Sequence, residues 1–410
     1  MTVRGVQLGQ RSETVRRANL STIVRALHIR GPLSRSELVA RTGLTRSAIR
    51  ELIGELVASG LASEGPSAPH GTPGRPSHVV RLEPGRAVVL ALEISVDSLA
   101  GAVIGLGGTV FGTVRVDRSC GDDSVETVVF QLTELARDML TRHGGDTLVG
   151  VGVAVVGIVR RSDGLVSVAP NLGWHDAALG SRLAASLRLP VPVAVANEAD
   201  LGALAEHRRG AAIDVENLIF ISGEVGVGGG IIAGGLPLTG VAGFGGEIGH
   251  LPVNPDGRAC RCGAIGCWET EVGETALLVG AGHDPGGGRA AVDAVLREAA
   301  DSSASARSSL ARLAHWLGIG LAGLVNVFNP RLIVLGGRFG RLHPFVCEGV
   351  EAELDRRALA GPRAIVSIVP TALGDDAALI GAAELAIEPL LSDPASWLSS
   401  TNLRPAEART

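Results

Sequence analysis

Three cysteines and one histidine lie close together in the glycine-rich residues 245–269, and their chemistry constrains the fold more than any other part of the 410-residue chain. Cys260, Cys262 and Cys267 supply three thiols within eight residues. With the imidazole of His250 just upstream they make a closed tetrahedral set for a structural Zn²⁺, with no open position for a catalytic water. The spacing is too short for a disulfide framework, because neighbouring cysteines rarely reach bridging geometry. The alternative is a group of small buried thiols in a loop, but the clustering favours zinc.

The same segment resembles the signature of the ROK (repressor, open reading frame, kinase) family. Residues 247–250 match its Glu-x-Gly-His, and residues 257–269 match its Gly-x-x-Cys-x-Cys-Gly-x-x-Gly-Cys-x-Glu. The resemblance implies that His250 binds zinc through one ring nitrogen and offers the other to a sugar hydroxyl. It also implies that Glu247 and Glu269 bind this sugar. Carboxylates and a metal-fixed imidazole form a rigid set of partners for the hydroxyls of a sugar ring.

The charge of the chain is divided unequally between its two ends. Residues 1–82 hold 12 Arg and five Glu, a net +7, while the rest holds 25 Arg and 37 acidic residues, a net −12. All 37 basic residues are arginines. A basic segment joined to an acidic body predicts that residues 1–82 form a domain that meets a polyanion.

Residues 1–82 also carry the pattern of a winged helix-turn-helix. Residues 17–28 have apolar side chains at helical spacing, the Ser34 to Glu37 run is a capping box, and Gly43 ends the second helix. Two short helices around a glycine turn are typical of helix-turn-helix units. Residues 67–77 are rich in proline and glycine and predict a wing. The alternative is a helical packing or dimerisation module whose arginines are only solvated. The candidate DNA contacts are Arg35, Arg46, Ser47 and Arg50 near helix starts, and Arg75 in the wing.

From residue 83 onward, apolar runs of β type alternate with helical stretches. Residues 87–94, 99–104, 109–116 and 148–156 predict strands, and residues 218–221 and 332–335 open similar units later in the chain. This alternation predicts an α/β body of two lobes with a cleft between them. We expect lobes at residues 83–200 and 201–370, a helix packing across them at residues 371–388, and a disordered polar tail at residues 389–410. The resemblance to the ROK family covers residues up to about 386 and implies a ribonuclease H-like, actin-type sugar kinase fold.

Three loops depart from the ROK kinase pattern. Residues 93–96 read Glu-Ile-Ser-Val where the family's kinases have an Asp and then Gly-Gly-Thr. Residues 222–230 carry Glu224 and Val225 in place of a Gly-Thr pair, which puts a carboxylate beside the expected triphosphate. Like charges a few ångströms apart cost on the order of a few kcal/mol. Residues 197–200 read Asn-Glu-Ala-Asp, so that Glu198 replaces the catalytic Asp of the family. We therefore expect weak ATP binding and no kinase activity.

The resemblance completes the candidate sugar site. It assigns Asn171, Asn197 and Glu198 to the same sugar as Glu247, His250 and Glu269, with no catalytic residue among them.

These features together predict a cytoplasmic, sugar-responsive transcriptional regulator of the NagC/XylR-like branch, acting as a repressor of carbohydrate metabolism genes. The expected partners are a double-stranded operator, a monosaccharide or sugar phosphate, and further copies of the chain in a dimer or tetramer. No apolar run approaches a membrane span, and the N-terminus lacks the core of a signal peptide. Two alternatives remain open: an active ATP-dependent sugar kinase with an appended DNA-binding head, and a zinc-responsive regulator. Which sugar acts, and whether it releases or promotes DNA binding, also stays open.

Overall fold

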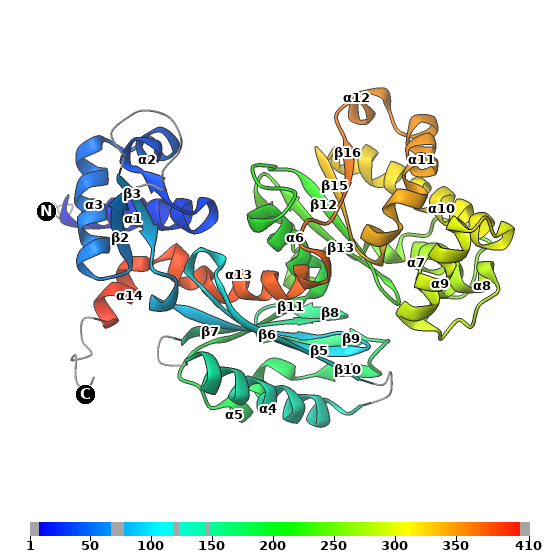
Figure 1. Ribbon diagram of the computed structural model, residues 1–410, viewed down its shortest axis with the longest axis horizontal. Helices are drawn as coiled ribbons and strands as arrows, with labels where there is room; N and C mark the ends of the chain where they lie inside the picture. Colours follow the sequence, from blue (N-terminus) through cyan, green and yellow to red (C-terminus); the bar gives the residue numbers. More distant parts are fainter. Residues whose placement is uncertain (1–7, 67–77, 119–122, 145–147, 402–410) are drawn as a thin grey trace, which may run out of the picture.

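A computed structural model describes residues 8–66, 78–118, 123–144 and 148–401 (Figure 1). Three parts follow one another along the chain. A small head of helices precedes two α/β lobes, each built on a five-stranded sheet. The observed class is therefore the predicted α/β fold with a helical N-terminal region.

The head packs three helices beside a three-stranded sheet of order β1-β3-β2. The predicted capping box is present, since Ser34 Oγ accepts from the backbone N–H of Glu37 at 3.2 Å and the Glu37 carboxylate accepts from Ser34 N at 2.7 Å. Gly43 ends the second helix with φ 70°, a left-handed conformation that glycine adopts without strain. The elements are α1 (Leu8–Arg30), β1 (Leu33–Ser34), α2 (Arg35–Thr42), α3 (Arg46–Ala58), β2 (Ala62–Pro66) and β3 (His78–Leu82). Residues 67–77, the predicted wing with Arg75, lie outside the described residues.

The first lobe is a mixed sheet of order β11-β7-β4-β5-β6, with helices α4 and α5 on one face. Strands β4 to β6 form an antiparallel meander, and β7 and β11 add in parallel, as the pairs Leu92–Gly101 and Leu92–Val153 show. The bounds are β4 (Val88–Ile94), β5 (Ser98–Gly105), β6 (Val110–Asp117), α4 (Val125–His143), β7 (Leu148–Val155), α5 (Leu179–Leu187) and β11 (Val193–Asn197). A small sheet, β8 (Ile158–Arg160), β9 (Leu165–Ala169) and β10 (Trp174–Ala177), extends this lobe toward the cleft.

The second lobe is a sheet of order β14-β13-β12-β15-β16, with most of its helices on the side away from the first lobe. Strands β12 and β15 are parallel, and β12 and β13 are antiparallel. The strands are β12 (Leu218–Gly223), β13 (Val227–Ala233), β14 (Leu236–Pro237), β15 (Leu332–Gly337) and β16 (Ser367–Pro370). The helices are α7 (Trp268–Val272), α8 (Glu274–Ala281), α9 (Gly288–Ala300), α10 (Ala304–Phe328), α11 (Arg338–Arg357) and α12 (Ala360–Arg363).

Two helices, α6 (Glu198–Arg209) and α13 (Ala377–Ser392), lie between the sheets of the two lobes (Figure 1). They approach backbone to backbone, because a Cβ placed on Gly381 of α13 would lie 2.0 Å from the carbonyl oxygen of Leu201 on α6. The same argument applies between α13 and β7, where a Cβ on Gly152 would lie 1.9 Å from Ala382 O. Glycine at both positions lets α13 sit directly on α6 and on the first sheet.

Three expectations about boundaries need correction. The expected lobe boundary at residues 200 and 201 falls inside α6. The helix expected at residues 371–388 begins at Ala377 and runs on to Ser392. Residues 389–401 are not a disordered tail, because α13 continues through Pro389 and is followed by α14 (Pro394–Thr401). The physical reason is burial. This stretch is mainly polar, but four of its apolar side chains recur at helical spacing and are buried, namely Leu390, Leu391, Ala395 and Leu398.

Helix α10 is the one helix in the described ranges that is long and apolar enough to cross a membrane, which the sequence analysis did not anticipate. More than half of its most apolar stretch is buried inside the structure. It packs against α11 and α8, so the buried core of the second lobe accounts for its apolar composition.

Candidate metal centre and binding cleft

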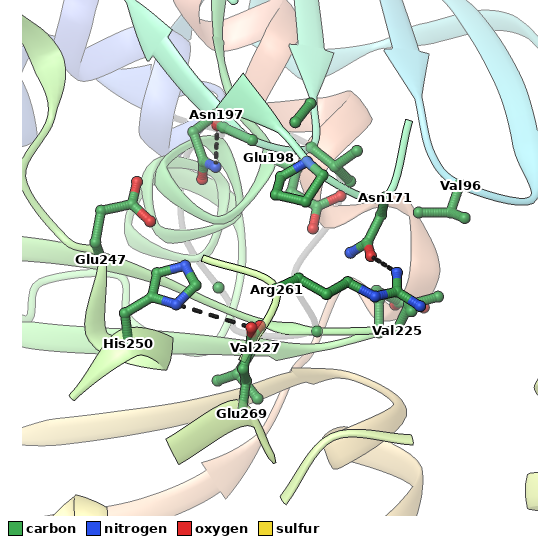
Figure 2. Close-up of a pocket in the computed structure, with 17 residues that line it drawn as sticks. Val96, Asn171, Asn197, Glu198, Val225, Val227, Glu247, His250, Arg261 and Glu269 are labelled. Atoms are coloured by element: carbon green, nitrogen blue, oxygen red, sulfur yellow. Dashed lines mark hydrogen bonds and ion pairs between the residues drawn. The ribbon is translucent and has the colours of Figure 1, made fainter. Parts of the chain in front are cut away.

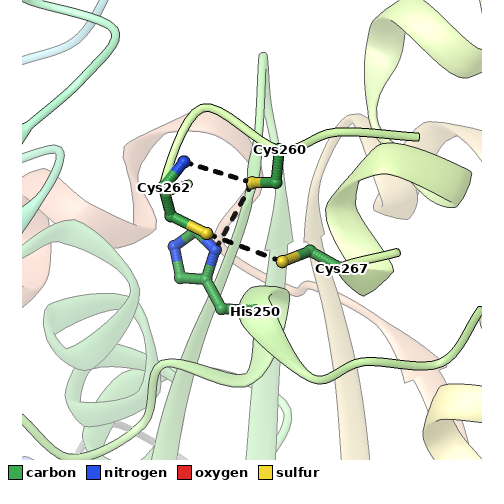
Figure 3. A group of neighbouring side chains, drawn as sticks. All are labelled: His250, Cys260, Cys262 and Cys267. Carbon is green, nitrogen blue, oxygen red and sulfur yellow. Dashed lines mark hydrogen bonds between the residues drawn. The ribbon is translucent and has the colours of Figure 1, made fainter. Parts of the chain in front are cut away.

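The ligand atoms of His250, Cys260, Cys262 and Cys267 lie within 4.8 Å of one another (Figure 3). His250 ends a short 3₁₀ turn, and Cys267 immediately precedes α7. The Sγ atoms of Cys262 and Cys267 are 3.6 Å apart, and His250 Nδ1 lies 3.8 Å from Cys260 Sγ. Tetrahedral zinc with Zn–S bonds of about 2.3 Å needs sulfurs about 3.8 Å apart. The four predicted ligands therefore fit a zinc ion.

Glycine allows residues 245–269, here called the metal loop, to turn tightly around the four ligands. Gly263 and Gly266 have φ values of 93° and 71°, a region that other residues rarely adopt. A Cβ on Gly266 would lie 1.6 Å from Asn254 O. A side chain at this position would push the loop away from Cys267.

All six residues of the predicted sugar site line one pocket of about 100 Å³ (Figure 2). Asn171 follows β9, Asn197 ends β11 and Glu198 begins α6, so these three come from the first lobe. Glu247, His250 and Glu269 come from the metal loop of the second lobe. The pocket thus lies between the lobes, and one nitrogen of the His250 ring faces the cysteines while the other faces the pocket.

Two of these side chains also have structural roles. Asn197 caps α6, because its Oδ1 accepts from Ala199 N at 2.8 Å and from Asp200 N at 3.2 Å. Its Nδ2 donates to Gly157 O at 2.9 Å, so the amide is largely occupied within the protein. Glu269 lies 2.9 Å from Cys260 Sγ and therefore contacts the cysteine cluster as well as the pocket.

Arg261 also lines the pocket and was missed in the sequence analysis. Its Nη1 donates to Asn171 Oδ1 at 2.6 Å, a bond that joins the metal loop of one lobe to the other lobe (Figure 2). The sequence feature that could have predicted it is its position between Cys260 and Cys262. If both cysteines bind one ion, the direction of the Arg261 side chain is also fixed.

The pocket is acidic. Burial raises the pKa of Glu198 well above its ordinary value, and the carboxylates of Glu224 and Glu93 raise it further. Burial also raises the pKa of Glu247, against the opposing effect of His250. A protonated carboxyl both donates and accepts hydrogen bonds, so the pocket offers both kinds of partner to neutral hydroxyl groups.

A family model described as the ROK family matches residues 89–389 of this chain. The chain belongs to the ROK family.

Relatives of this ROK chain include both regulators and kinases. It is 27% identical to a xylose repressor of Bacillus subtilis (strain 168) over 380 residues, covering 92% of this chain and 97% of the repressor. It is 29% identical to a glucokinase of Streptomyces coelicolor over 322 residues, covering 74% of this chain and 98% of the kinase.

Solved structures show the same division. A ROK family transcriptional regulator, a homolog of the E. coli MLC protein, superposes with a TM-score of 0.74 at 25% identity, covering 94% of this chain and 98% of that one. A ROK family glucokinase from Streptomyces griseus in complex with glucose and AMPPNP has a TM-score of 0.65 at 27% identity, covering 74% of this chain and 100% of the kinase.

An ion-pair cluster occupies the loop where ROK kinases are expected to bring backbone toward phosphate. Glu224 Oε2 lies 3.6 Å from Nε of Arg338, a guanidinium that is 6% exposed and also pairs with Glu274. A Cβ on Gly337 would lie 2.4 Å from Glu224 Oε1, so the carboxyl lies against this turn. Burial raises the pKa of Glu224 to about 7 despite Arg338. The paired side chains of Glu224 and Arg338 thus occupy the loop where backbone would approach a phosphate.

The head places three predicted DNA contacts on one exposed helix start. Arg46, Ser47 and Arg50 lie at the N-terminal end of α3, which Thr45 caps. Within the described ranges, neither arginine has an assigned hydrogen-bond or ion-pair partner. Arg35 differs, because its Nη2 donates to Glu64 on β2 at 2.7 Å. Its predicted DNA contact would require release of that pair, which the sequence pattern did not reveal.

Asp200 gives a pH-dependent prediction for this ROK chain. It is 6% exposed, and burial raises its pKa to about 6. The folded state therefore binds its proton more tightly than the unfolded chain, and stability falls as pH rises from about 4 to about 6. Asp200→Asn removes this cost and is expected to stabilise the protein at pH 8 by on the order of 2 kcal/mol, with no gain at pH 4. Thermal unfolding at both pH values measures the difference.

Asp138→Asn, on the exposed face of α4, makes the same chemical change without burial and serves as the control. An Asp200→Asn gain that is equal at pH 4 and pH 8 would contradict the assignment.

Proposed function

We propose that this chain is a sugar-responsive DNA-binding repressor whose kinase-derived body binds a monosaccharide without phosphorylating it. The observation that carries the proposal is the joining of a basic head to a ROK body that retains a polar interlobe pocket. The Bacillus subtilis xylose repressor aligns over nearly the whole chain, whereas the Streptomyces coelicolor glucokinase covers about three quarters of it. The part of this chain that the repressor covers and the glucokinase does not is close in length to the head.

In this proposal the head is a winged helix-turn-helix. Helix α3 enters the major groove with Arg46, Ser47 and Arg50, and the β2–β3 hairpin forms the wing. A homodimer presents two heads to a pseudo-palindromic operator, because a two-fold protein matches a two-fold site.

The body binds sugar through Asn171, Glu198, Glu247, His250 and Glu269, with Asn197 positioning the start of α6. Zinc, held by His250, Cys260, Cys262 and Cys267, supplies a structural tie that fixes the ring of His250 and the loop between Glu247 and Glu269. Neutral hydroxyls suit this acidic pocket, and the xylose repressors among the relatives make xylose the first sugar to test.

The absence of kinase activity is part of the proposal. Glu224 and Arg338 support it, because a nucleotide phosphate would have to displace an ion pair whose arginine is buried and approach a carboxyl. Glu198 supports the competing kinase function, because it lies in the pocket where ROK kinases carry their catalytic Asp.

A ligand panel tests the proposal. Thermal unfolding of the zinc-loaded chain is measured with xylose, other monosaccharides, their phosphates and ATP. A ligand at a hundred times its Kd adds about 2.7 kcal/mol of stability. We expect at least one sugar to stabilise the protein and ATP to leave it unchanged. Stabilisation by ATP, with sugar-dependent ADP release above that of Glu198→Gln, would show a kinase instead.

A further inference from the structure

The head contacts the body through carboxylates that it shares with α6. Glu384 and Glu388 lie one helical turn apart on α13. Each binds a side chain of α1 in the head and an arginine at the end of α6. The contact is deeply buried, since Glu384 is 2% exposed and His28 is 1% exposed.

Glu384 is the centre of this contact. His28 Nδ1 accepts from the backbone N–H of Gly107 at 3.0 Å, so the proton of a neutral ring lies on Nε2, which is 3.2 Å from both oxygens of Glu384. Arg208 and Arg209 donate to the same carboxylate at 3.1 and 2.7 Å. Burial would raise the pKa of Glu384, but His28 and the two arginines together lower it well below its ordinary value.

Glu388 repeats the arrangement nearer the surface. Arg25 of α1 binds both of its oxygens, at 3.0 and 2.7 Å, and Arg208 Nη2 donates to Oε2 at 2.6 Å. Arg209 Nη1 also donates to the carbonyl oxygen of His28 at 2.6 Å. The end of α6 therefore contacts α1 both directly and through α13.

The other end of α6 lies in the binding pocket. The helix begins at Asn197 and Glu198, and its 12 residues span about 18 Å at 1.5 Å per residue. It has little freedom to shift by itself. A Cβ on Gly230 of β13 would lie 2.3 Å from Ala199 O, and one on Gly381 of α13 would lie 2.0 Å from Leu201 O. A displacement at the pocket end is therefore carried to the Arg208 end.

We propose that α6 transmits occupancy of the pocket to the DNA-binding head, with Arg208 and Arg209 as positioning residues whose pairing with Glu384 and Glu388 sets the position of α1. The inference rests on the proposed function. A buried carboxylate that loses its partners is costly, so α1, whose His28 and Arg25 bind Glu384 and Glu388, must follow when α6 and α13 move together. Because such coupling is reciprocal, operator binding also changes the affinity for sugar.

The test compares three full-length zinc-loaded variants. Arg208→Met removes the α6 contact to Glu388 and one of the two α6 arginines that bind Glu384, but it keeps an apolar stem. Arg25→Met removes the head side of the Glu388 contact at a partly exposed position, which protects the fold. Arg17→Met is the matched control, because Arg17 lies on α1 but its partners in the described residues are Asp393 and Ser396, and not Glu384 or Glu388. Thermal unfolding checks that each variant is folded.

The readout is the ratio of operator affinities with and without the stabilising sugar, beside the affinity for sugar alone. We expect Arg208→Met and Arg25→Met to bring the ratio at least fivefold closer to one, with sugar affinity within threefold of wild type. Arg17→Met should keep the wild-type ratio. A folded Arg208→Met that keeps the ratio, or an Arg17→Met that loses as much, overturns the inference. A wild-type ratio of one with a sugar that binds would instead refute the proposed function.

Discussion

Loss of zinc is expected to weaken sugar binding by about 10- to 100-fold while the lobes stay folded, the range seen when the groups that orient a site are removed. The metal would hold His250, and the loop between Glu247 and Glu269 follows it, so three of the sugar contacts depend on one ion. The core of the first lobe contains no residue of the metal loop, and the core of the second lobe is built mainly by its strands and helices, with Ile248 and Trp268 added from the loop.

Cys262→Ser tests this expectation. Cys262 is exposed, so its replacement removes a ligand without opening a core cavity. Bound zinc, thermal unfolding and sugar affinity are measured on the same preparation. Cys347→Ser is the matched control, because Cys347 lies on α11 away from the cluster. A folded Cys262→Ser protein that binds no zinc and still binds sugar as tightly as wild type would contradict the account.

Substitution of both Arg46 and Arg50 by Ala is expected to lower operator affinity by about 100- to 1,000-fold, because one arginine contact to a base edge contributes about 1–3 kcal/mol. Both guanidinium groups are exposed on the first turns of α3, and α3 is held by buried Ile49 and Ile53 on its opposite face. The change therefore removes charge without disturbing the head. Sugar binding should be unchanged.

Fluorescence anisotropy with the operator, at several salt concentrations, measures this loss. A contact to phosphate also reduces the slope of log affinity against log salt by about one per arginine. Substitution of both Arg137 and Arg142 by Ala, on the exposed face of α4, removes the same two charges from the body as a control. Equal losses for the two sites would show that net charge, and not α3, governs binding.

The sequence predicts those features of the site and the fold that residues close together along the chain create. The capping box of Ser34 and Glu37 and the cysteine cluster depend on spacings of a few residues, and both arrangements are present. The six predicted pocket residues also meet, because the family pattern orders them along the chain.

Contacts between distant segments could not be predicted in this way. His28 and Glu384 are 356 residues apart, and Arg338 pairs with Glu224 at the ends of two neighbouring strands, β15 and β12, that lie far apart in the sequence. Neither pair has a local signature. Residues 389–401 were misread because composition averages over the few apolar side chains that contact the head, although their helical spacing was available.

Operator binding by the wild-type chain during sugar titration tests the central claim most directly. The zinc-loaded protein and a DNA duplex that it selects from a random pool are held at fixed salt while xylose, and then any other stabilising sugar, is added with and without ATP. The account predicts a change of at least about tenfold in operator affinity, of the order usual for linked sites, and no consumption of ATP. Unchanged operator affinity at saturating sugar, or steady turnover of ATP, would contradict it.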